Sequence, residues 1–294
     1  MELLFIINPT AGKGMTVKAI PLIKEYCSKH SLPFRIIETS YAGEATVLAR
    51  EAVKNNLKGV IAVGGDGTVL ETANGLMGSG IPLGILPLGS GNDFARALNI
   101  PRGIQSVEKA LQILKDGKTS SVDVGLFFDC AFLNVASIGF DAEIVRDLPK
   151  VKRFLKGSAA YVASVFYKFL TYKNKTVTLT IDGQDITTDL FLAAICNGTC
   201  YGGGMKVNPN GSPTDGFFDL ILIKPVSRYK VPLLLGRFKK GLHLDLPYVS
   251  TYRCKEVKVT SNEPLVINAD GEAVGETPAT FAIRPLSIKV FTVI

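Results

Sequence analysis

The stretch Gly59–Gly75, GVIAVGGDGTVLETANG, joins an apolar run to a glycine-rich turn and an amphipathic segment. The run Val60–Val63 is short and hydrophobic on both faces, which predicts a buried strand of a parallel sheet. The segment from Val69 predicts a helix, so the glycines lie where a strand passes into a helix N-terminus. Such a turn presents free backbone N–H groups and the positive end of a helix dipole, and its glycines let phosphate oxygens approach the backbone. The stretch therefore predicts a phosphate-binding turn.

Asp66 is the single acid within this turn, Gly64–Thr68. A carboxylate beside phosphates repels them unless a metal ion or a proton intervenes. Another interpretation is that the turn needs glycine only for its backbone geometry, with Asp66 as a helix cap. The turn taken alone leaves both interpretations open.

The first part of the chain alternates predicted strands and helices, which is typical of a doubly wound parallel sheet. The predicted strands are Leu3–Ile7, Phe34–Glu38, Val60–Val63 and Ile81–Leu88, and the predicted helices begin near Met15, Glu44, Val69 and Phe94. Ligands of such sheets bind at the carboxyl ends of the strands. We therefore expect the turns after the first, third and fourth strands to converge on one ligand site.

Two of these turns resemble the glycine turn in composition. Asn8–Gly14 lacks the Gly-Lys-Ser/Thr ending of a Walker A loop, but its asparagine, threonine and glycine backbone suit a nucleotide. Gly89–Asp93 carries a second acid. Asp93 could act in the site, or Asp93 or Asn92 could simply cap the helix that follows.

From about Ser121 the sequence changes to short strands joined by turns with glycine, asparagine or aspartate, which indicates an antiparallel β-rich domain. The predicted strands are Val122–Gly125, Cys130–Ile138, Thr176–Ile181, Leu190–Cys196, Phe218–Ile223, Glu256–Thr260, Leu265–Asn268 and Ser287–Val293, and the predicted helices are Gly157–Tyr172 and a segment near Arg228–Leu242. We expect an α/β domain over residues 1–124 and a β-rich antiparallel sandwich over residues 125–294.

Two acidic turns stand out in this second part. Ser212–Asp219 places two carboxylates around a tight turn, and oxygen-rich turns of this kind hold Mg²⁺ or Ca²⁺. A solvated Asp-Gly turn is an equally good interpretation. Asn268–Glu272 is either an ordinary hairpin turn or one that presents an acid to a ligand.

Length and composition indicate a globular protein of two domains. The chain has 294 residues, of which 47% are hydrophobic and 20% charged, and this length exceeds the usual size of one core. No apolar run reaches the ~20 residues that span a bilayer, and Met1–Ile7 lacks the basic start of a signal peptide. We therefore expect a cytoplasmic protein. The five cysteines are scattered and odd in number, so no disulfide framework is expected.

The net charge of +7 suggests an anionic partner: a nucleotide, a nucleic acid or a membrane surface. The sequence has no RNA-binding sheet signature, zinc finger or basic DNA-binding helix, so no nucleic-acid partner is expected. Charge alone does not choose between a nucleotide and a membrane.

Five motifs, in order along essentially the whole chain, resemble the bacterial soluble diacylglycerol kinase and lipid kinase family, which is related to eukaryotic diacylglycerol and sphingosine kinases. The motifs are Asn8–Gly12, Gly64–Thr68, Leu88–Arg96, Asp215–Gly216 and Asp270–Glu272. The glycine turn is also shared with NAD kinases and phosphofructokinases, whose likeness implies an NAD-kinase-like first domain. The Asn-Asp-Phe-Ala-Arg segment and the late Asp-Gly-Glu make the lipid kinase resemblance specific.

The resemblance implies roles for the matching residues. Glu272 would be the catalytic base that accepts the lipid hydroxyl proton, and Asp66 and Asp93 would assist through Mg²⁺ or the substrate hydroxyl. A structural Mg²⁺ would be held by the carboxylate of Asp215 and the carbonyls of Ser212 and Phe217. ATP, the phosphate donor, would be bound by Asn8, Pro9, Thr10, Ala11, Gly12, Thr39, Gly64, Gly65, Asp66, Gly67, Thr68, Val69, Leu70 and Ser90. Ser90 stands where family members often have threonine, and it keeps the hydroxyl.

A kinase of membrane lipids must reach the membrane, and we expect a peripheral association with an anionic surface. Two clusters mix basic with apolar residues, as such a surface requires. The basic members are Arg146, Lys150, Lys152, Arg153 and Lys156 in one cluster and Arg228, Lys230, Arg237, Lys239 and Lys240 in the other; the apolar members are Phe154, Tyr229, Leu233–Leu235 and Phe238. A solvated helix face is the alternative.

The favoured function is an ATP-dependent lipid kinase that converts diacylglycerol to phosphatidic acid. A sphingoid base, a monoacylglycerol or a polyprenol remains an alternative acceptor. An NAD kinase would need a polar dinucleotide pocket and no membrane, and a regulatory nucleotide-binding protein would need none of the acids Asp66, Asp93 and Glu272. The sequence does not decide the oligomeric state, and a homodimer is one of the options.

Overall fold

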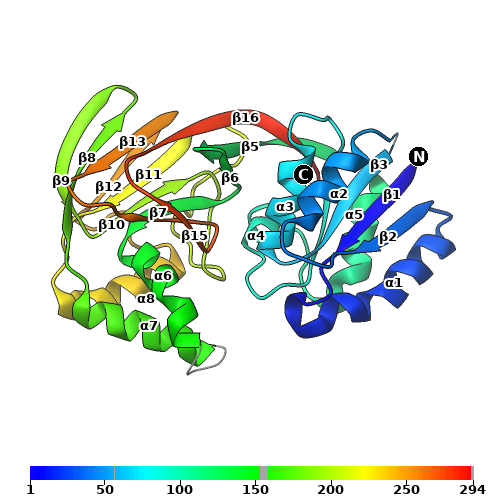
Figure 1. Cartoon of the computed structure of the whole chain (residues 1–294), viewed down its shortest axis with the longest axis horizontal. Helices are drawn as coiled ribbons and strands as arrows, with labels where there is room; N and C mark the ends of the chain where they lie inside the picture. The colour runs from blue at the N-terminus through cyan, green and yellow to red at the C-terminus, as the bar shows by residue number, and fades with distance from the viewer. Residues whose placement is uncertain (56, 153–157, 293–294) are drawn as a thin grey trace. The chain divides into compact units, whose positions relative to one another are not determined.

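The computed structural model describes residues 1–55, 57–152 and 158–292 and divides into two compact units (Figure 1). Unit 1 comprises Met1–Val124 and Arg284–Ile294, and unit 2 comprises Gly125–Ile283. The last segment belongs to unit 1 because the end of strand β16 (Ala279–Phe291) pairs with β4 (Leu83–Pro87). The division expected from the sequence had left that segment with the second part.

The sheet of unit 1 is parallel, in the order β2-β1-β3-β4 with the end of β16 beside β4. Its other strands are β1 (Glu2–Ile7), β2 (Phe34–Glu38) and β3 (Leu57–Gly64). The four apolar runs that predicted strands in the first part of the chain lie in β1, β2, β3 and β4. The run Val60–Val63 is fully buried in the middle of the sheet.

Helices cover both faces of this sheet. They are α1 (Met15–Lys29), α2 (Glu44–Ala52), α3 (Asp66–Leu76), α4 (Asp93–Ala97) and α5 (Val107–Asp116). The chain moves outward from β1 to β2 and then back across the sheet to β3 and β4, so right-handed crossovers place α1 on one face and α2 and α3 on the other. In agreement, α2 packs against α3, and α1 against α5. The predicted doubly wound architecture is confirmed.

Unit 2 contains two antiparallel sheets. The first has the order β12-β11-β10-β7-β14-β15, and the second contains β13, β8, β9, β6 and the parts of β16 and β5 that belong to unit 2. The strands are β5 (Thr119–Phe127), β6 (Cys130–Phe132), β7 (Val135–Gly139), β8 (Lys175–Ile181), β9 (Gln184–Leu190), β10 (Leu192–Cys196), β11 (Phe218–Ile223), β12 (Val249–Cys254), β13 (Glu256–Ser261), β14 (Val266–Ala269) and β15 (Glu272–Glu276).

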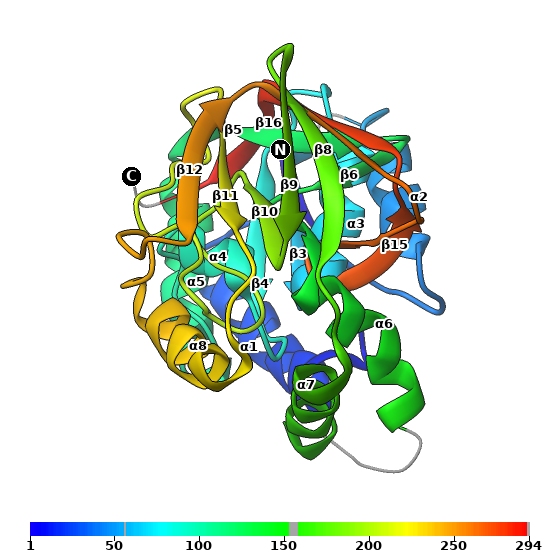
Figure 2. The same ribbon diagram turned by 90° about the vertical axis from the view of Figure 1, so that its left-hand side faces the viewer.

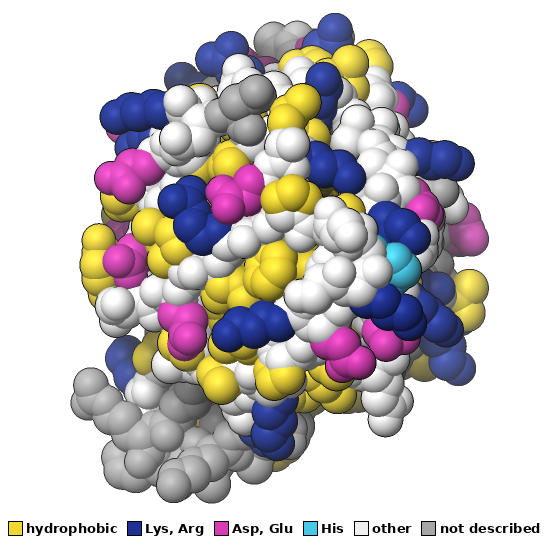
Figure 3. All heavy atoms as spheres, turned by 90° about the vertical axis from the view of Figure 1, so that its right-hand side faces the viewer, with side chains coloured by type: hydrophobic (Ala, Val, Ile, Leu, Met, Phe, Trp, Pro, Cys, Tyr) yellow, Lys and Arg dark blue, Asp and Glu magenta, His cyan; other side chains and the backbone are white. Residues whose placement is uncertain are grey.

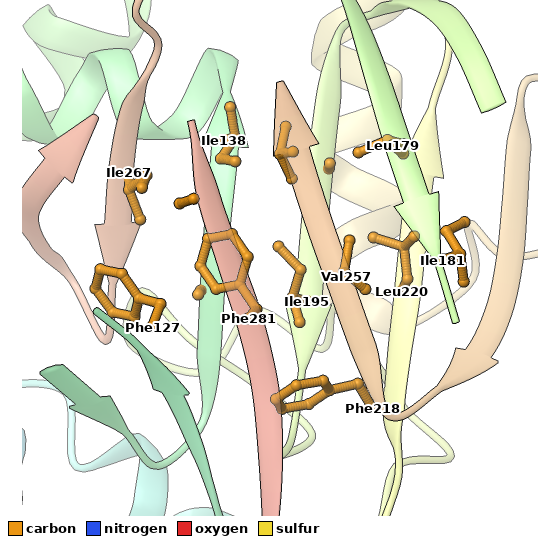
Figure 4. Close-up of a cluster of buried hydrophobic side chains, with 14 of the residues drawn as sticks. Phe127, Ile138, Leu179, Ile181, Ile195, Phe218, Leu220, Val257, Ile267 and Phe281 are labelled. Atoms are coloured by element: carbon orange, nitrogen blue, oxygen red, sulfur yellow. The ribbon is translucent and has the colours of Figure 1, made fainter. Parts of the chain in front are cut away.

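The core of unit 2 lies between these two sheets (Figure 4). Ile138, Ile195 and Leu220 come from the first sheet, and they pack against Val257 and Phe281 from the second. This arrangement confirms the predicted β-sandwich.

Three helices cover the other face of the first sheet, and they lie together below the strands in Figure 2. They are α6 (Phe140–Lys152), α7 (Ser158–Thr171) and α8 (Val231–Lys240). Their buried side chains form a second apolar cluster with those of the sheet. Helix α6 was not predicted. Among the residues that the structure describes, no helix is both long and apolar enough to cross a membrane.

The close contact between α2 and α3 depends on a glycine. A Cβ atom at Gly75 would lie 2.5 Å from the Cβ of Ala49 and 2.6 Å from the carbonyl oxygen of Thr46. We predict that Gly75→Ala lowers the free energy of unfolding by roughly 1–2 kcal/mol, because overpacking outweighs the better helix propensity of alanine. Thermal melts of the purified protein would measure the change.

Gly236 provides the matched control, since it lies in helix α8 and a Cβ there meets no atom within 4 Å. Gly236→Ala should leave the melting temperature unchanged or raise it slightly. Equal effects of the two substitutions would contradict the packing argument.

Candidate functional site

Three turns of unit 1 touch at the carboxyl ends of β1, β3 and β4. A Cβ at Gly89 would lie 2.3 Å from the Cα of Gly65, and a Cβ at Gly12 would lie 1.9 Å from the carbonyl oxygen of Leu88. Gly12 also has a φ of +58°, which favours glycine. The glycines therefore let three separate turns approach to backbone contact, as the sequence predicts.

Hydrogen bonds join the same turns. Asn8 Nδ2 donates to Thr68 Oγ1 over 3.3 Å, and the N–H groups of Leu88 and Gly89 donate to the carbonyl oxygen of Gly64 over 2.8 and 3.0 Å. Within the first turn, Asn8 Oδ1 accepts from the backbone and the hydroxyl of Thr10. The rim of the sheet is thus one connected surface of backbone and small polar groups.

Asp66 connects the turn after β3 to helix α4, which follows β4. Its Oδ2 accepts from the N–H of Asn92 over 2.7 Å, and its Oδ1 accepts from the N–H groups of Asp93 and Phe94 over 2.6 and 3.3 Å. These donors form the N-terminus of α4. Asp66 is therefore a helix cap, as one interpretation of the sequence held, but it caps the helix of a neighbouring turn rather than its own.

Asp93 and Asn92 have different surroundings. Asp93 is buried, and its Oδ1 lies 3.7 Å from Nε of Arg96. Asn92 adopts a left-handed conformation and closes its turn with two hydrogen bonds to the backbone of Gly89. A Cβ at Gly91 would lie 2.7 Å from Oδ2 of Asp66 and 3.5 Å from Oδ2 of Asp93. Both carboxylates thus border Gly91.

The remaining predicted nucleotide residues of unit 1 differ in exposure. Thr10, Gly67 and Ser90 are exposed at the turns. Thr39 lies at the end of β2, where its N–H donates to Ile7 over 2.8 Å. Val69 is buried in the core, so its side chain is not accessible to a ligand.

In unit 2, Glu272 follows a tight hairpin turn between β14 and β15. Asp270 and Gly271 form the turn with φ values of +48° and +96°, as two-residue hairpins require. The carboxylate of Asp270 accepts from the N–H groups of Leu133, Asn134 and Val135 over 2.6, 3.0 and 3.0 Å. The side chain of Glu272 is exposed, and its carboxylate has no hydrogen bond or ion pair among the described residues. The carboxylate of Glu272 is thus accessible, while the hairpin that carries it is held in place by Asp270.

The Ser212–Phe217 turn differs from the magnesium site that the resemblance implies. Oδ2 of Asp215 lies 3.0 Å from the guanidinium of Arg253, and its Oδ1 accepts from the N–H of Phe217. The guanidinium also stacks 4.5 Å from the ring of Phe217. Within the described part of the chain, no group of three or more His, Cys, Asp or Glu side chains could hold a metal ion. In this structure the single carboxylate of the implied set is paired with Arg253, and a magnesium ion at this turn stays a prediction.

Unit 2 also contains an apolar cavity of about 240 Å³ between its first sheet and helices α6–α8. It is lined by Phe140, Asp141, Ile144, Val165, Phe191, Leu192, Tyr201, Met205, Leu234, Leu235 and Phe238. Among the described lining residues, Asp141 is the one with a charged side chain, and burial raises the pKa of its carboxyl. Neither the cavity nor Asp141 was predicted from the sequence, since neither has a local motif.

Comparisons with known proteins cover both units. Residues 2–127 match a family model described as "Diacylglycerol kinase catalytic domain", and residues 134–292 match "YegS C-terminal NAD kinase beta sandwich-like domain". A diacylglycerol kinase from Mycobacterium tuberculosis is 32% identical over 97% of this chain and 93% of its own length. One from Bacillus subtilis is 30% identical over 94% of this chain and 91% of its own.

Solved structures show the same fold. A diacylglycerol kinase from Bacillus anthracis matches 99% of this chain and 96% of its own with a TM-score of 0.73 at 24% identity. A second solved structure from Bacillus anthracis matches 99% of this chain and 96% of its own with a TM-score of 0.78 at 25% identity.

The anchoring of the hairpin turn by Asp270 can be tested directly. Asn tolerates the same positive φ, but its amide offers one acceptor oxygen to three backbone donors. We predict that Asp270→Asn lowers the free energy of unfolding by about 1–3 kcal/mol, as measured by urea denaturation. The control is Asp185→Asn, because Asp185 is exposed and accepts one hydroxyl hydrogen bond from Thr180. If Asp185→Asn lowers the free energy of unfolding as much as Asp270→Asn does, Asp270 does not anchor the hairpin turn.

Proposed function

The chain belongs to the diacylglycerol kinase family and is an ATP-dependent lipid kinase, and we propose that its acceptor is the free hydroxyl of diacylglycerol, which it converts to phosphatidic acid. The observation that carries the nucleotide part of the proposal is the contact of three glycine turns at one edge of the parallel sheet. Phosphoryl transfer depends mainly on positioning and charge stabilisation. A rim of backbone N–H groups at helix N-termini suits the phosphates of ATP.

The nucleotide would lie on the turns of unit 1. Asn8–Gly12 and Gly64–Leu70 would contact it through backbone and hydroxyl groups, with Thr39 and Ser90 at the ends of the neighbouring strands. Mg²⁺ would arrive with ATP, and it neutralises developing charge on the phosphates. The Ser212–Phe217 turn has no part in this proposal, because its carboxylate is paired with Arg253.

The three acids would divide the work according to their surroundings. Asp66 holds α4 through backbone hydrogen bonds and so keeps the turns in register. Asp93 borders the same glycine, where it would act on the phosphates through Mg²⁺ or on the acceptor hydroxyl. Glu272 has a free, exposed carboxylate, so we assign to it the proton of the attacking hydroxyl.

The lipid would be bound by unit 2. The cavity of about 240 Å³ is lined mainly by apolar side chains, and ligand pockets of ~300–1,000 Å³ usually hold whole drug-sized ligands. This cavity therefore suits part of a lipid, such as one acyl chain. A polar dinucleotide would find few partners in it, which disfavours an NAD kinase.

The proposed function can be tested with purified protein, labelled ATP, Mg²⁺ and a panel of lipids in mixed micelles. Diacylglycerol should be phosphorylated faster than a sphingoid base, a monoacylglycerol or a polyprenol, and NAD should not react. If another lipid reacts faster, that lipid is the acceptor instead of diacylglycerol. If only NAD is phosphorylated, the protein is not a lipid kinase.

The role of Glu272 leads to a specific prediction. Glu272→Gln should reduce kcat by about 10²–10⁴-fold, since loss of a general base costs that much, while the affinity for ATP measured by calorimetry should not change. Glu276→Gln is the matched control, because Glu276 is an exposed acid on the same strand. If the Glu272 variant keeps more than a third of the wild-type rate, Glu272 is not the base.

Diacylglycerol lies in membranes, and helix α8 is the best candidate for the docking surface. Arg237, Lys239 and Lys240 are exposed at its last turn, close in sequence to the exposed apolar residues Tyr229 and Leu233. Basic side chains next to apolar ones suit an anionic bilayer surface.

The other predicted cluster is less suited to docking. On α6, Arg146 pairs with Glu143, and Lys150 pairs with Asp147 over 3.3 Å. Arg153, Phe154 and Lys156 lie outside the described residues, as do the side chains of Lys152 and Arg228. Figure 3 shows the right-hand side of Figure 1, which does not include α6; there, basic and acidic side chains are interspersed rather than gathered in one basic patch.

We predict that reversing Arg237, Lys239 and Lys240 to glutamate reduces binding to anionic vesicles by at least ~100-fold, because each basic residue near such a surface contributes about 1 kcal/mol. Vesicle sedimentation at fixed ionic strength measures the binding. ATP binding should be unchanged, since the nucleotide turns belong to unit 1.

The control for this variant reverses Lys18, Lys24 and Lys29 on α1, three exposed lysines that change the net charge equally. Equal vesicle binding by the α8 variant and the wild type would exclude α8 as the docking surface. Equal losses in both variants would show an effect of net charge alone.

A further inference from the structure

A chain of hydrogen bonds, buried at its centre, runs from the hairpin that carries Glu272 to the apolar cavity. The N–H of Gly271 donates to Asn268 Oδ1 over 3.1 Å, and Asn268 Nδ2 donates to Ser137 Oγ over 2.9 Å. Ser137 Oγ donates to Asp141 Oδ2 over 2.6 Å. These contacts join strand β14, strand β7 and the start of helix α6, and we call them the relay.

The direction of every hydrogen bond in the relay is fixed by its two ends. A backbone N–H can only donate, so the Asn268 side chain must present its oxygen to Gly271 and its NH₂ to Ser137. The Ser137 hydroxyl then accepts from Asn268 and must donate onward to Asp141. Ser137 and Asn268 are 0% and 1% exposed, so bulk water does not compete for these hydrogen bonds. The relay therefore has one arrangement, and it needs an acceptor at position 141.

Asp141 also belongs to the lining of the apolar cavity. Its Oδ2 ends the relay, and its Oδ1 is shielded from solvent and has no hydrogen bond among the residues described. Burial raises the pKa of this carboxyl, so its charge is costly in this environment. A ligand in the cavity would contact the same carboxyl that fixes the relay.

The hairpin has a second anchor that does not involve the relay. Asp270 accepts three backbone N–H groups from the segment between β6 and β7. Loss of the relay should therefore shift the Gly271–Glu272 turn without releasing it. A displacement of about 1 Å at a reacting group can cost ~10²-fold in rate.

We propose that Asp141 is a positioning residue for Glu272, which it orients through Ser137 and Asn268, and that it links this carboxylate to the occupant of the apolar cavity. The proposal rests on the proposed lipid kinase function for the role of Glu272. The relay itself does not depend on that function.

Steady-state kinetics with diacylglycerol micelles test the positioning role. Asp141→Leu and Ser137→Ala should each lower kcat by about 10- to 100-fold with the KM for ATP unchanged. The double variant should be no slower than the slower single variant, since both substitutions break one chain of bonds. Asp141→Asn should recover most of the rate, because its amide oxygen still accepts from Ser137.

Cys254→Ala is the matched control, because it removes a buried atom of unit 2 that lies outside the relay. It should leave kcat unchanged. Wild-type kcat in Asp141→Leu and Ser137→Ala would overturn the proposal, and so would an Asp141→Asn variant as slow as Asp141→Leu.

Hydrogen exchange at the Gly271 amide gives a readout that does not require activity. Exchange should be faster in Ser137→Ala than in the wild type and unchanged in Cys254→Ala, provided that thermal melts show both variants folded. Unchanged exchange in Ser137→Ala would overturn the relay even in an active kinase. Faster exchange in a protein that phosphorylates no lipid would support the relay and refute the proposed function instead.

Discussion

The carboxylate of Asp66 is the contact on which the geometry of unit 1 depends. Helix α4 has five residues, too few to be stable alone, and its first N–H groups need acceptors. Asp66 supplies these acceptors from the turn after β3. The positions of Asn92 and Asp93, and through Asn92 that of Gly89, follow from this one side chain. The glycines at Gly65 and Gly89 then allow the two turns to touch.

Unit 2 uses the same device at its own acidic turn. Asp270 accepts three backbone N–H groups from a segment 135 or more positions away, and this fixes the turn of the β14–β15 hairpin. Charge-assisted hydrogen bonds of this kind are the stronger ones. In both units, then, a carboxylate next to a glycine turn acts first on the protein backbone. An acidic residue in a glycine-containing turn therefore need not touch a ligand.

The fold was largely predictable because hydrophobic runs of four to eight residues bounded by glycine or proline give strong local signals. The errors arise where distant residues decide the structure. Residues 130–138 were predicted as one strand, but the chain divides into β6 and β7 where Asp270 binds residues 133–135. Likewise, the pairing of Asp215 with Arg253 and the place of Asp141 beside the cavity depend on tertiary contacts without a sequence motif.

The surroundings of the acids also restrict which of them can move a proton. Asp66 and Asp270 each accept hydrogen bonds from backbone donors through both oxygens, so both carboxylates are already engaged by the protein. Asp141 lies beside an apolar cavity and ends a chain of hydrogen bonds. Glu272 differs from all three, because its carboxylate is exposed while its backbone is held by an anchored hairpin. A base needs a carboxylate that is free to accept and a backbone that is not free to move, and among these four acids Glu272 meets both conditions.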